Sequence, residues 1–269
     1  MFAVFKTLPS SATAAAALLV VSGSAAFSQD AAPDVRLAPQ TAVYELSLER
    51  SNDGTIAAAE GRLAVQLTDT CEGYALSERM VLELFPADGE PTVIDSQFSS
   101  YEARDHSLYR YSSKLIVNGS EVDATEGTGL GGDGARQADI RKPEAAELAL
   151  PPGALFPLEF STKMIGAALM GDGSFEAPYF DGDSDNPTVL VSAQFLNETT
   201  GPNTLQENGR SWLTTLAFYN LETSAEQPIY QSSLRLYENG VADQMLLNYG
   251  DFSIRAELGD LELLPSGCD

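Results

Sequence analysis

Short segments of alternating apolar and polar residues run along most of this chain and constrain its fold more than any other feature. In Thr41–Arg50, Tyr44 and Leu46 fall on one side of the alternation, and Glu45 and Ser47 fall on the other. A period of two is typical of a half-buried β-strand. The turn signal Asn52-Asp53-Gly54 follows directly.

The same pattern recurs after this first strand, with turn signals about every ten residues, which is typical of antiparallel β architecture. Further strands are predicted at Gly61–Thr68, Tyr74–Leu84, Thr92–Tyr101, Ser107–Val117, Thr188–Leu196, Ser211–Asn220, Ile229–Glu238 and Val241–Leu258. No repeat of fixed length is present. We therefore predict a mainly β protein, one continuous antiparallel meander in a single domain.

The middle of the chain has a different character. Asn118–Arg141 is polar and glycine-rich, which predicts an extended loop or a weak hairpin. Glu159–Met170 carries apolar residues at helical spacing, and Gly171 suits a C-terminal cap. One helix is therefore expected to interrupt the meander.

The N-terminus has the order of a secretory signal peptide. A short region with one cation, Lys6, precedes the apolar run Ala12–Val21 and then small residues. The run is about half the roughly 20 residues that a spanning helix needs. We predict a signal peptide at residues 1–28, cleaved after Ala26 or Ser28, a mature domain at residues 29–269, and no later membrane span.

Cys71 and Cys268 are the only cysteines and lie far apart in the sequence. No C-x-x-C pair indicates a redox site, and two cysteines are too few for a zinc cluster. In an oxidising compartment two such cysteines most often pair, so a Cys71–Cys268 disulfide is expected. The alternative is two separate thiols.

The formal charge of −24 argues against nucleic acid and anionic lipid surfaces as partners. Acidity alone does not identify a partner, because a high net charge also serves solubility.

Two local patterns resemble ligand sites but lack the context that their chemistry needs. Gly129, Gly131 and Gly134 form a literal G-x-G-x-x-G, yet an acidic segment precedes it and no amphipathic helix follows. Asp181–Asp185 resembles the start of a calcium loop, but Asn186 and Ser192 stand where glycine and glutamate are required. A flexible glycine loop and a solvated turn explain these segments more simply, and only adventitious calcium is left as an alternative.

No catalytic residue is predicted. His106 is the single histidine, and the sequence has no G-x-S-x-G nucleophile elbow with which it could act. We expect His106 in a surface turn. Trp212 is assigned to strand packing rather than to a sugar platform. We expect no metal and no cofactor.

Several segments together resemble one known family. They are Leu37–Leu46, Thr70–Tyr74 around the first cysteine, Leu150–Pro157, Phe180–Asp185, and Pro265–Cys268 around the second cysteine. In this order they resemble the EipB-like cell-envelope integrity proteins, which are periplasmic proteins of alphaproteobacteria. One departure is that Leu158, Glu159 and Phe160 follow the Phe-Pro pair, where the family often has threonine and histidine. No role of that histidine is therefore carried over.

The resemblance implies a single antiparallel sheet wound into a spiral or open barrel, with one helix and a disulfide. It also implies periplasmic localisation and a role in envelope integrity under stress. We therefore expect a non-enzymatic protein that binds a periplasmic or envelope protein. The alternatives are a carrier of lipid or lipoprotein acyl chains with an apolar cavity, by analogy of fold alone, and an envelope-directed hydrolase.

Overall fold

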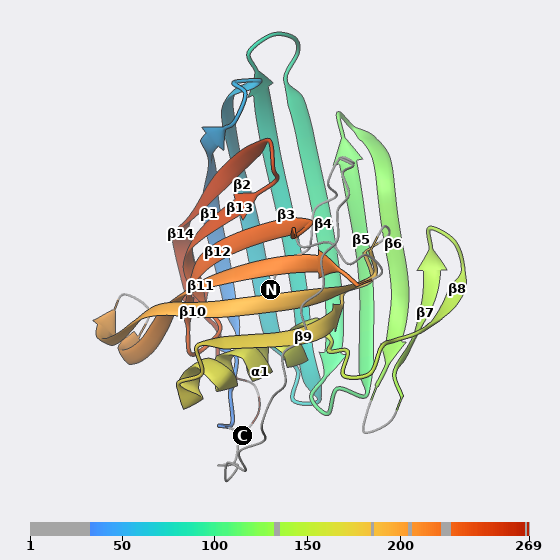
Figure 1. The fold of residues 1–269 in the computed structure, drawn as a ribbon, viewed down its shortest axis with the longest axis vertical. Helices are drawn as coiled ribbons and strands as arrows, with labels where there is room; N and C mark the ends of the chain where they lie inside the picture. The colour runs from blue at the N-terminus through green and yellow to red at the C-terminus, as the bar shows by residue number, and fades with distance from the viewer. Residues whose placement is uncertain are drawn as a thin grey trace, which may run out of the picture.

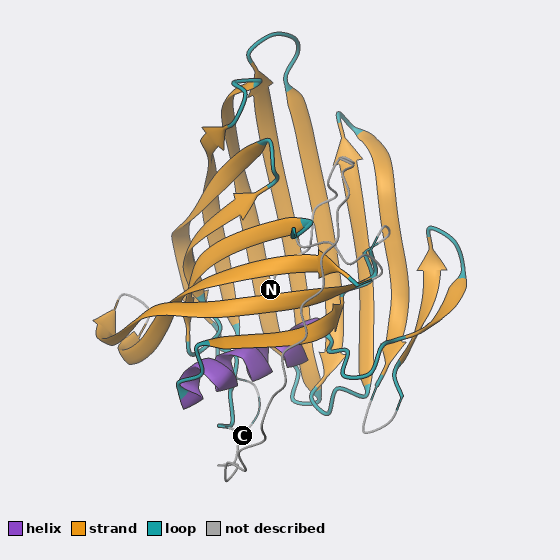
Figure 2. Ribbon diagram, in the orientation of Figure 1, coloured by secondary structure: helices purple, strands orange, loops and turns teal. Residues whose placement is uncertain are grey.

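The structure, a computed structural model, describes residues 33–131, 135–183, 186–203, 206–221, 227–266 and Cys268. Within these residues, 14 strands form a single sheet and one helix crosses an end of it (Figures 1 and 2). The predicted signal peptide lies outside the described residues, as do Gly134, Ser184 and Asp185. None of the described helices has the length and apolarity needed to cross a membrane.

The first half of the chain forms eight strands. They are β1 (Gln40–Ser51), β2 (Ile56–Asp69), β3 (Gly73–Pro86), β4 (Thr92–Ala103), β5 (Leu108–Val117), β6 (Ser120–Leu130), β7 (Gln137–Lys142) and β8 (Ala146–Ala149). The helix and six strands follow. They are α1 (Pro157–Met170), β9 (Ser174–Phe180), β10 (Thr188–Asn203), β11 (Gln206–Asn220), β12 (Tyr230–Tyr237), β13 (Ala242–Asn248) and β14 (Phe252–Leu263).

The strand order places the two ends of the chain together in the middle of the sheet. β1 pairs with β2 on one side and with β14 on the other, both antiparallel. From this centre the order runs outward to β8 at one edge and to β9 at the other. The two edges are not paired with each other, and the sheet curls so that β9–β13 face β2–β5 across the interior (Figure 1). The predicted open, wound meander is confirmed.

The concave face of the curled sheet holds the main apolar core. Along β1, Ala42, Tyr44 and Leu46 are buried while Glu45 and Ser47 are exposed, as the alternation predicts. Side chains from both halves of the sheet share this core, among them Leu76 and Met80 of β3 and Phe218 of β11. Burial of this continuous apolar surface is what stabilises the curled sheet.

α1 closes one end of the sheet (Figure 2). Phe160, Met164 and Ile165 are buried against the core, and Gly171 takes the left-handed conformation at the C-cap with φ 86°. The predicted helix is therefore confirmed, and it starts two residues earlier than expected because Pro157 occupies its first turn.

Of the two structures predicted for Asn118–Arg141, the hairpin is confirmed and the extended loop is wrong, because β6 and β7 pair antiparallel across most of this segment. Their inward positions include Gly127 and Gly129, and large rings stand over both. A Cβ atom at position 129 would lie only 2.6 Å from the Phe156 ring. The glycines that suggested a loop thus make room for aromatic side chains on the sheet.

Candidate functional site

Glu102, at the end of β4, binds the first turn of α1. Its carboxylate accepts the backbone N–H of Leu158 at 2.8 Å and of Glu159 at 2.9 Å. Phe156 at the N-cap offers no side-chain bond of its own. A carboxylate at a helix N-terminus satisfies orphan amides and complements the helix dipole. Glu102 therefore fixes α1 to the sheet.

His106 binds the same carboxylate. Its Nδ1 lies 2.8 Å from Oε1 of Glu102, so we assign the proton of the bond to Nδ1. Burial raises the pKa of Glu102, although the His106 and backbone hydrogen bonds oppose that rise. His106 sits in a turn with φ 55°, as predicted, but it is half-buried rather than a surface residue.

Glu159 lies next to this pair and has cationic partners. Arg136 binds it through two nitrogens, and Nζ of Lys163 lies 2.9 Å from Oε1. Burial raises the pKa of Glu159, but the bonds from Arg136 and Lys163 outweigh it and hold the pKa below its ordinary value.

Ligand atoms of Glu102, His106 and Glu159 lie within 4.8 Å of one another, which is close enough to hold a metal ion. However, both carboxylates already accept bonds from amides, an arginine and a lysine. A cation would have to displace these donors. We therefore interpret Glu102, His106 and Glu159 as part of a hydrogen-bonded ionic network that holds α1 in place, rather than as a metal centre.

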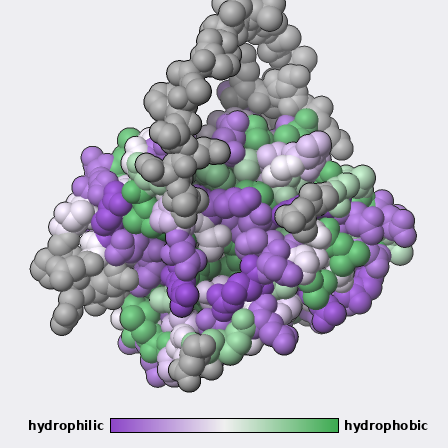
Figure 3. All heavy atoms as spheres, turned by 90° about the horizontal axis from the view of Figure 1, so that it is seen from below, coloured by the Kyte–Doolittle hydropathy of each residue, from purple (hydrophilic) through white to green (hydrophobic). Residues whose placement is uncertain are grey.

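A pocket of about 740 Å³ opens beside this network, and we call it the α1 pocket. One face of α1, the ends of β3 and β4, and the segment that leads into β1 form its walls. The lining residues used below are Val35, Arg104, His106, Thr162, Lys163, Gly166, Met170 and Phe175. Figure 3 views the molecule from the end that α1 covers and shows hydrophobic atoms recessed among hydrophilic ones. A volume of this size is typical of small-ligand sites.

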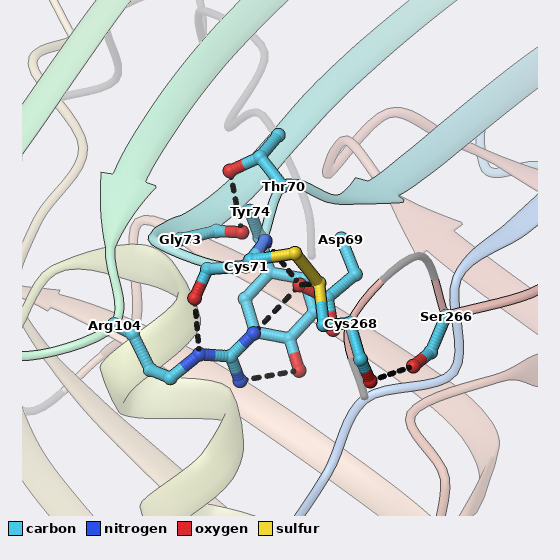
Figure 4. Close-up of a disulfide and its surroundings, with 8 residues drawn as sticks. All are labelled: Asp69, Thr70, Cys71, Gly73, Tyr74, Arg104, Ser266 and Cys268. Atoms are coloured by element: carbon cyan, nitrogen blue, oxygen red, sulfur yellow. Dashed lines mark hydrogen bonds and ion pairs between the residues drawn. A yellow bond between two sulfur atoms is a disulfide. The ribbon is translucent and has the colours of Figure 1, made fainter.

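The disulfide lies beside Arg104 and Tyr74, two residues that line the α1 pocket (Figure 4). Cys71 and Cys268 are bonded, as predicted, so the alternative of two separate thiols is wrong. Arg104 donates to the backbone oxygen of Cys71 at 3.2 Å and to Asp69 at 2.6 Å, and it lies over the Tyr74 ring. The last residues of the chain are thereby held against the β2–β3 turn.

A second buried cluster packs β5 against the segments that flank α1. The rings of Tyr109, Tyr111, Phe156 and Phe180 stack or meet edge to face. We call this cluster the aromatic seam, because it joins the two halves of the sheet where no strands pair. It takes over the role that ladder hydrogen bonds play elsewhere in the sheet.

Asp181, just after the aromatic seam, is buried rather than part of a solvated turn as predicted. Its carboxylate accepts the Asp183 N–H, and Asp183 in turn accepts the Asn186 N–H. These are local turn bonds of the kind that aspartate makes without a cation. Burial, with the nearby Asp183 charge, raises the pKa of Asp181 to about 7.

The inner face near the opposite ends of β4 and β5 is apolar but not fully buried. Ile94 of β4 is opposite Leu82 of β3 on one side and Val117 of β5 on the other. Ser96 is opposite Met80 and Leu115 in the same way. Leu82 and Met80 are buried. Residues directly opposite each other in a ladder share a face. Ile94, Leu115 and Val117 therefore point inward, yet all three are half-buried. We call these three residues the inner patch.

The sequence did not indicate the Glu102–His106 pair or the α1 pocket, because their residues come from distant segments. The one available signal was the spacing of Glu102 and His106 by four residues across a turn. The G-x-G-x-x-G residues that the structure describes lie in or just after β6, and Gly129 packs under Phe156, so the described part of the motif is structural. Trp212 is buried on an inward strand face, as predicted.

The fold and these features define an open antiparallel β-spiral that a helix closes at one end and that a disulfide ties together between the β2–β3 turn and Cys268. The EipB-like family model matches residues 31–265, and the chain belongs to the EipB-like family. It is 29% identical over 248 residues to the cell envelope integrity protein EipB of Brucella abortus strain 2308, a match that covers 88% of each chain. A crystal structure of a β-barrel-like protein of a domain of unknown function from Brucella abortus superimposes with a TM-score of 0.79. That match is at 27% identity and covers 86% of this chain and 100% of the other.

Proposed function

We propose that this protein supports cell envelope integrity from the periplasm by binding a protein or another envelope component, without catalysing a reaction. The relationship to a protein named for envelope integrity supports the cellular role. The inner patch supports binding, because half-buried apolar residues on a concave sheet face favour association with a partner.

The carboxylates of the α1 region support a non-catalytic role. A hydrolase that uses paired carboxylates needs one of them free to hold or take up a proton near its substrate. Glu102 is occupied by three donors, and Glu159 is paired with Arg136 and Lys163. Both groups are committed to holding α1 in place.

A pair of adjacent positions in β5 gives a matched test of the binding surface. Leu115 points inward, and its neighbour Lys114 is exposed on the outer face. A photo-crosslinking residue at 115 is expected to capture an envelope component in living cells, and the same residue at 114 is not. Equal capture at both positions would contradict binding on the inner face.

The cellular role is tested separately with a deletion strain. We expect the strain to be sensitive to detergent and to cell-wall antibiotics, and Lys114→Glu to restore resistance. Leu115→Glu is expected not to restore resistance, although the variant protein accumulates to the normal level. A deletion strain that tolerates these agents under several growth conditions would refute the envelope role.

A further inference from the structure

The wall that α1 gives to the α1 pocket changes character along the helix. Thr162 and Lys163 lie near the N-terminal turn, beside His106, whereas Gly166, Ala167 and Met170 lie further along. Val35 and Phe175 continue the apolar part of the wall. The pocket thus has a polar end at His106 and an apolar stretch beyond it, with the exposed Asp172 at the far rim and small residues between that leave room for a ligand.

The charge balance of the pocket differs from that of the chain. The lining contains three cations and three acids, Arg36, Arg104, Lys163, Asp34, Glu102 and Asp172, whereas the whole chain carries −24. Lys163 is half-exposed and shares its carboxylate partner, Glu159, with Arg136. The lining is therefore neutral by formal count, so an anion meets less repulsion here than on the acidic chain as a whole.

His106 adds a directed polar group at the same end. Its Nδ1 is held by Glu102, and Nε2 makes no hydrogen bond to any described residue. Because the ring is fixed by its other nitrogen, Nε2 is oriented in advance for a ligand. Such fixation lowers the ordering cost of binding.

We propose that the α1 pocket binds an amphiphile with one anionic head group and an unbranched acyl chain. The head group lies between Lys163 and His106, and the chain runs along Gly166 and Ala167 toward Met170 and Phe175. This site is separate from the inner patch, which lies at the other ends of β4 and β5, so each proposal is tested independently of the other.

Dodecanoate, titrated calorimetrically into the purified mature protein below its micellar concentration, tests the head group. We expect one molecule bound per chain and no binding of dodecyltrimethylammonium, which has the same chain and the opposite charge. Lys163→Gln is expected to weaken dodecanoate binding about tenfold, the loss of roughly one charge-assisted bond. Lys114→Gln, at a similarly exposed lysine outside the pocket, is expected to leave it unchanged. Equal losses in the two variants, or preferred binding of the cation, would overturn the proposal.

Gly166→Leu tests the position of the chain. A Cβ atom at Gly166 would meet only ordinary contacts, 3.8 Å from Val35 and 3.9 Å from Pro33, so a side chain can start there and its outer atoms would occupy the pocket. We expect dodecanoate binding to be lost. Gly173→Leu, at a glycine with open space around it, is expected to bind normally. Wild-type affinity in Gly166→Leu, with unchanged circular dichroism, would rule out this pocket.

A comparison of head groups distinguishes two sources of the amphiphile. If dodecanoate binds more tightly than dodecanoyl lysophosphatidylglycerol, the ligand of the pocket is a free fatty acid. If the lysophosphatidylglycerol binds more tightly, the ligand is a lysophospholipid. Binding of neither would refute the proposal.

Discussion

Glu102 and Asp181 are both buried carboxyl groups, but their surroundings differ. Glu102 receives two backbone amides and the His106 imidazole, so its burial is partly compensated. The Asp181 carboxylate receives the Asp183 N–H beside the aromatic seam, and its pKa is raised to about 7. Glu102 therefore stabilises α1, whereas ionised Asp181 destabilises the fold near neutral pH.

Asp181→Asn should change how stability depends on pH. The unfolded pKa of aspartate is about 3.9. Because the folded pKa of Asp181 is higher, at about 7, the native state holds a proton that the unfolded state has lost between these values. The contribution of the Asp181 carboxyl to wild-type stability is therefore fully present below about pH 4, and it is lost as the pH rises through 7.

The asparagine keeps an oxygen for the Asp183 N–H and carries no charge. We expect it to raise the free energy of unfolding at pH 8 by on the order of 4 kcal/mol, with no gain at pH 4. Urea unfolding of both proteins at the two pH values measures this. A gain of the same size at pH 4 would show that ionisation is not the cause.

Glu102→Gln tests the attachment of α1. The amide turns an NH₂ group toward a backbone N–H or toward His106, so at least one buried donor loses its acceptor. We expect a loss of about 1–3 kcal/mol in the free energy of unfolding. Glu176→Gln, at an exposed position of β9, serves as the control. If both variants lose the same stability, Glu102 has no special role at the helix.

At the scale of elements, the sequence predicted strands wherever one face is apolar and the other polar. It left β6 undecided between an extended loop and a weak hairpin, because the inward residues Thr125, Gly127 and Gly129 are polar or small. The ring of Tyr111 lies over Gly127 and that of Phe156 over Gly129, and local patterns cannot reveal these contacts. It also merged β13 and β14, although Asn248, Gly250 and Asp251 mark the turn between them.

The aromatic seam makes an element-scale prediction. Phe156 is fully buried among Tyr109, Phe180 and Gly129. Phe156→Ala is expected to lower the free energy of unfolding by about 3–5 kcal/mol, because it removes a large side chain and leaves a cavity. Leu213→Ala, at a position that is 41% exposed, is expected to cost far less. Thermal or urea unfolding compares the two, and equal losses would show that the seam does not stabilise the sheet.

At the scale of the whole molecule, the fold class and the cysteine pair were predictable, and the strand order was not. Alternation shows which side chains share a face, but it does not show which strands become neighbours. The pairing of β1 with β14 joins residues about as far apart as the two cysteines. The α1 pocket likewise combines residues from Val35 to Phe175, which explains why no local motif indicated it.

The disulfide closes a loop of 197 residues, so it restricts the unfolded chain strongly. In the chain-entropy model such a loop contributes about 5 kcal/mol. We expect the Cys71→Ser, Cys268→Ser double variant to unfold at a much lower denaturant concentration than the oxidised protein. Reduction of the wild-type protein should produce the same shift. Coincident unfolding curves for the reduced and oxidised protein would contradict this account.

The position of β1 in the centre of the sheet has a consequence for the order of folding. β1 has β2 as a near neighbour in the sequence, but its other edge has no partner until β14, nearly the last segment of the chain, is in place. For that interval the growing sheet carries a hydrogen-bonding edge that other chains can join. Contacts of such long sequence separation also form slowly. Completion of the fold therefore depends on protecting one strand from the time it forms until the chain is finished.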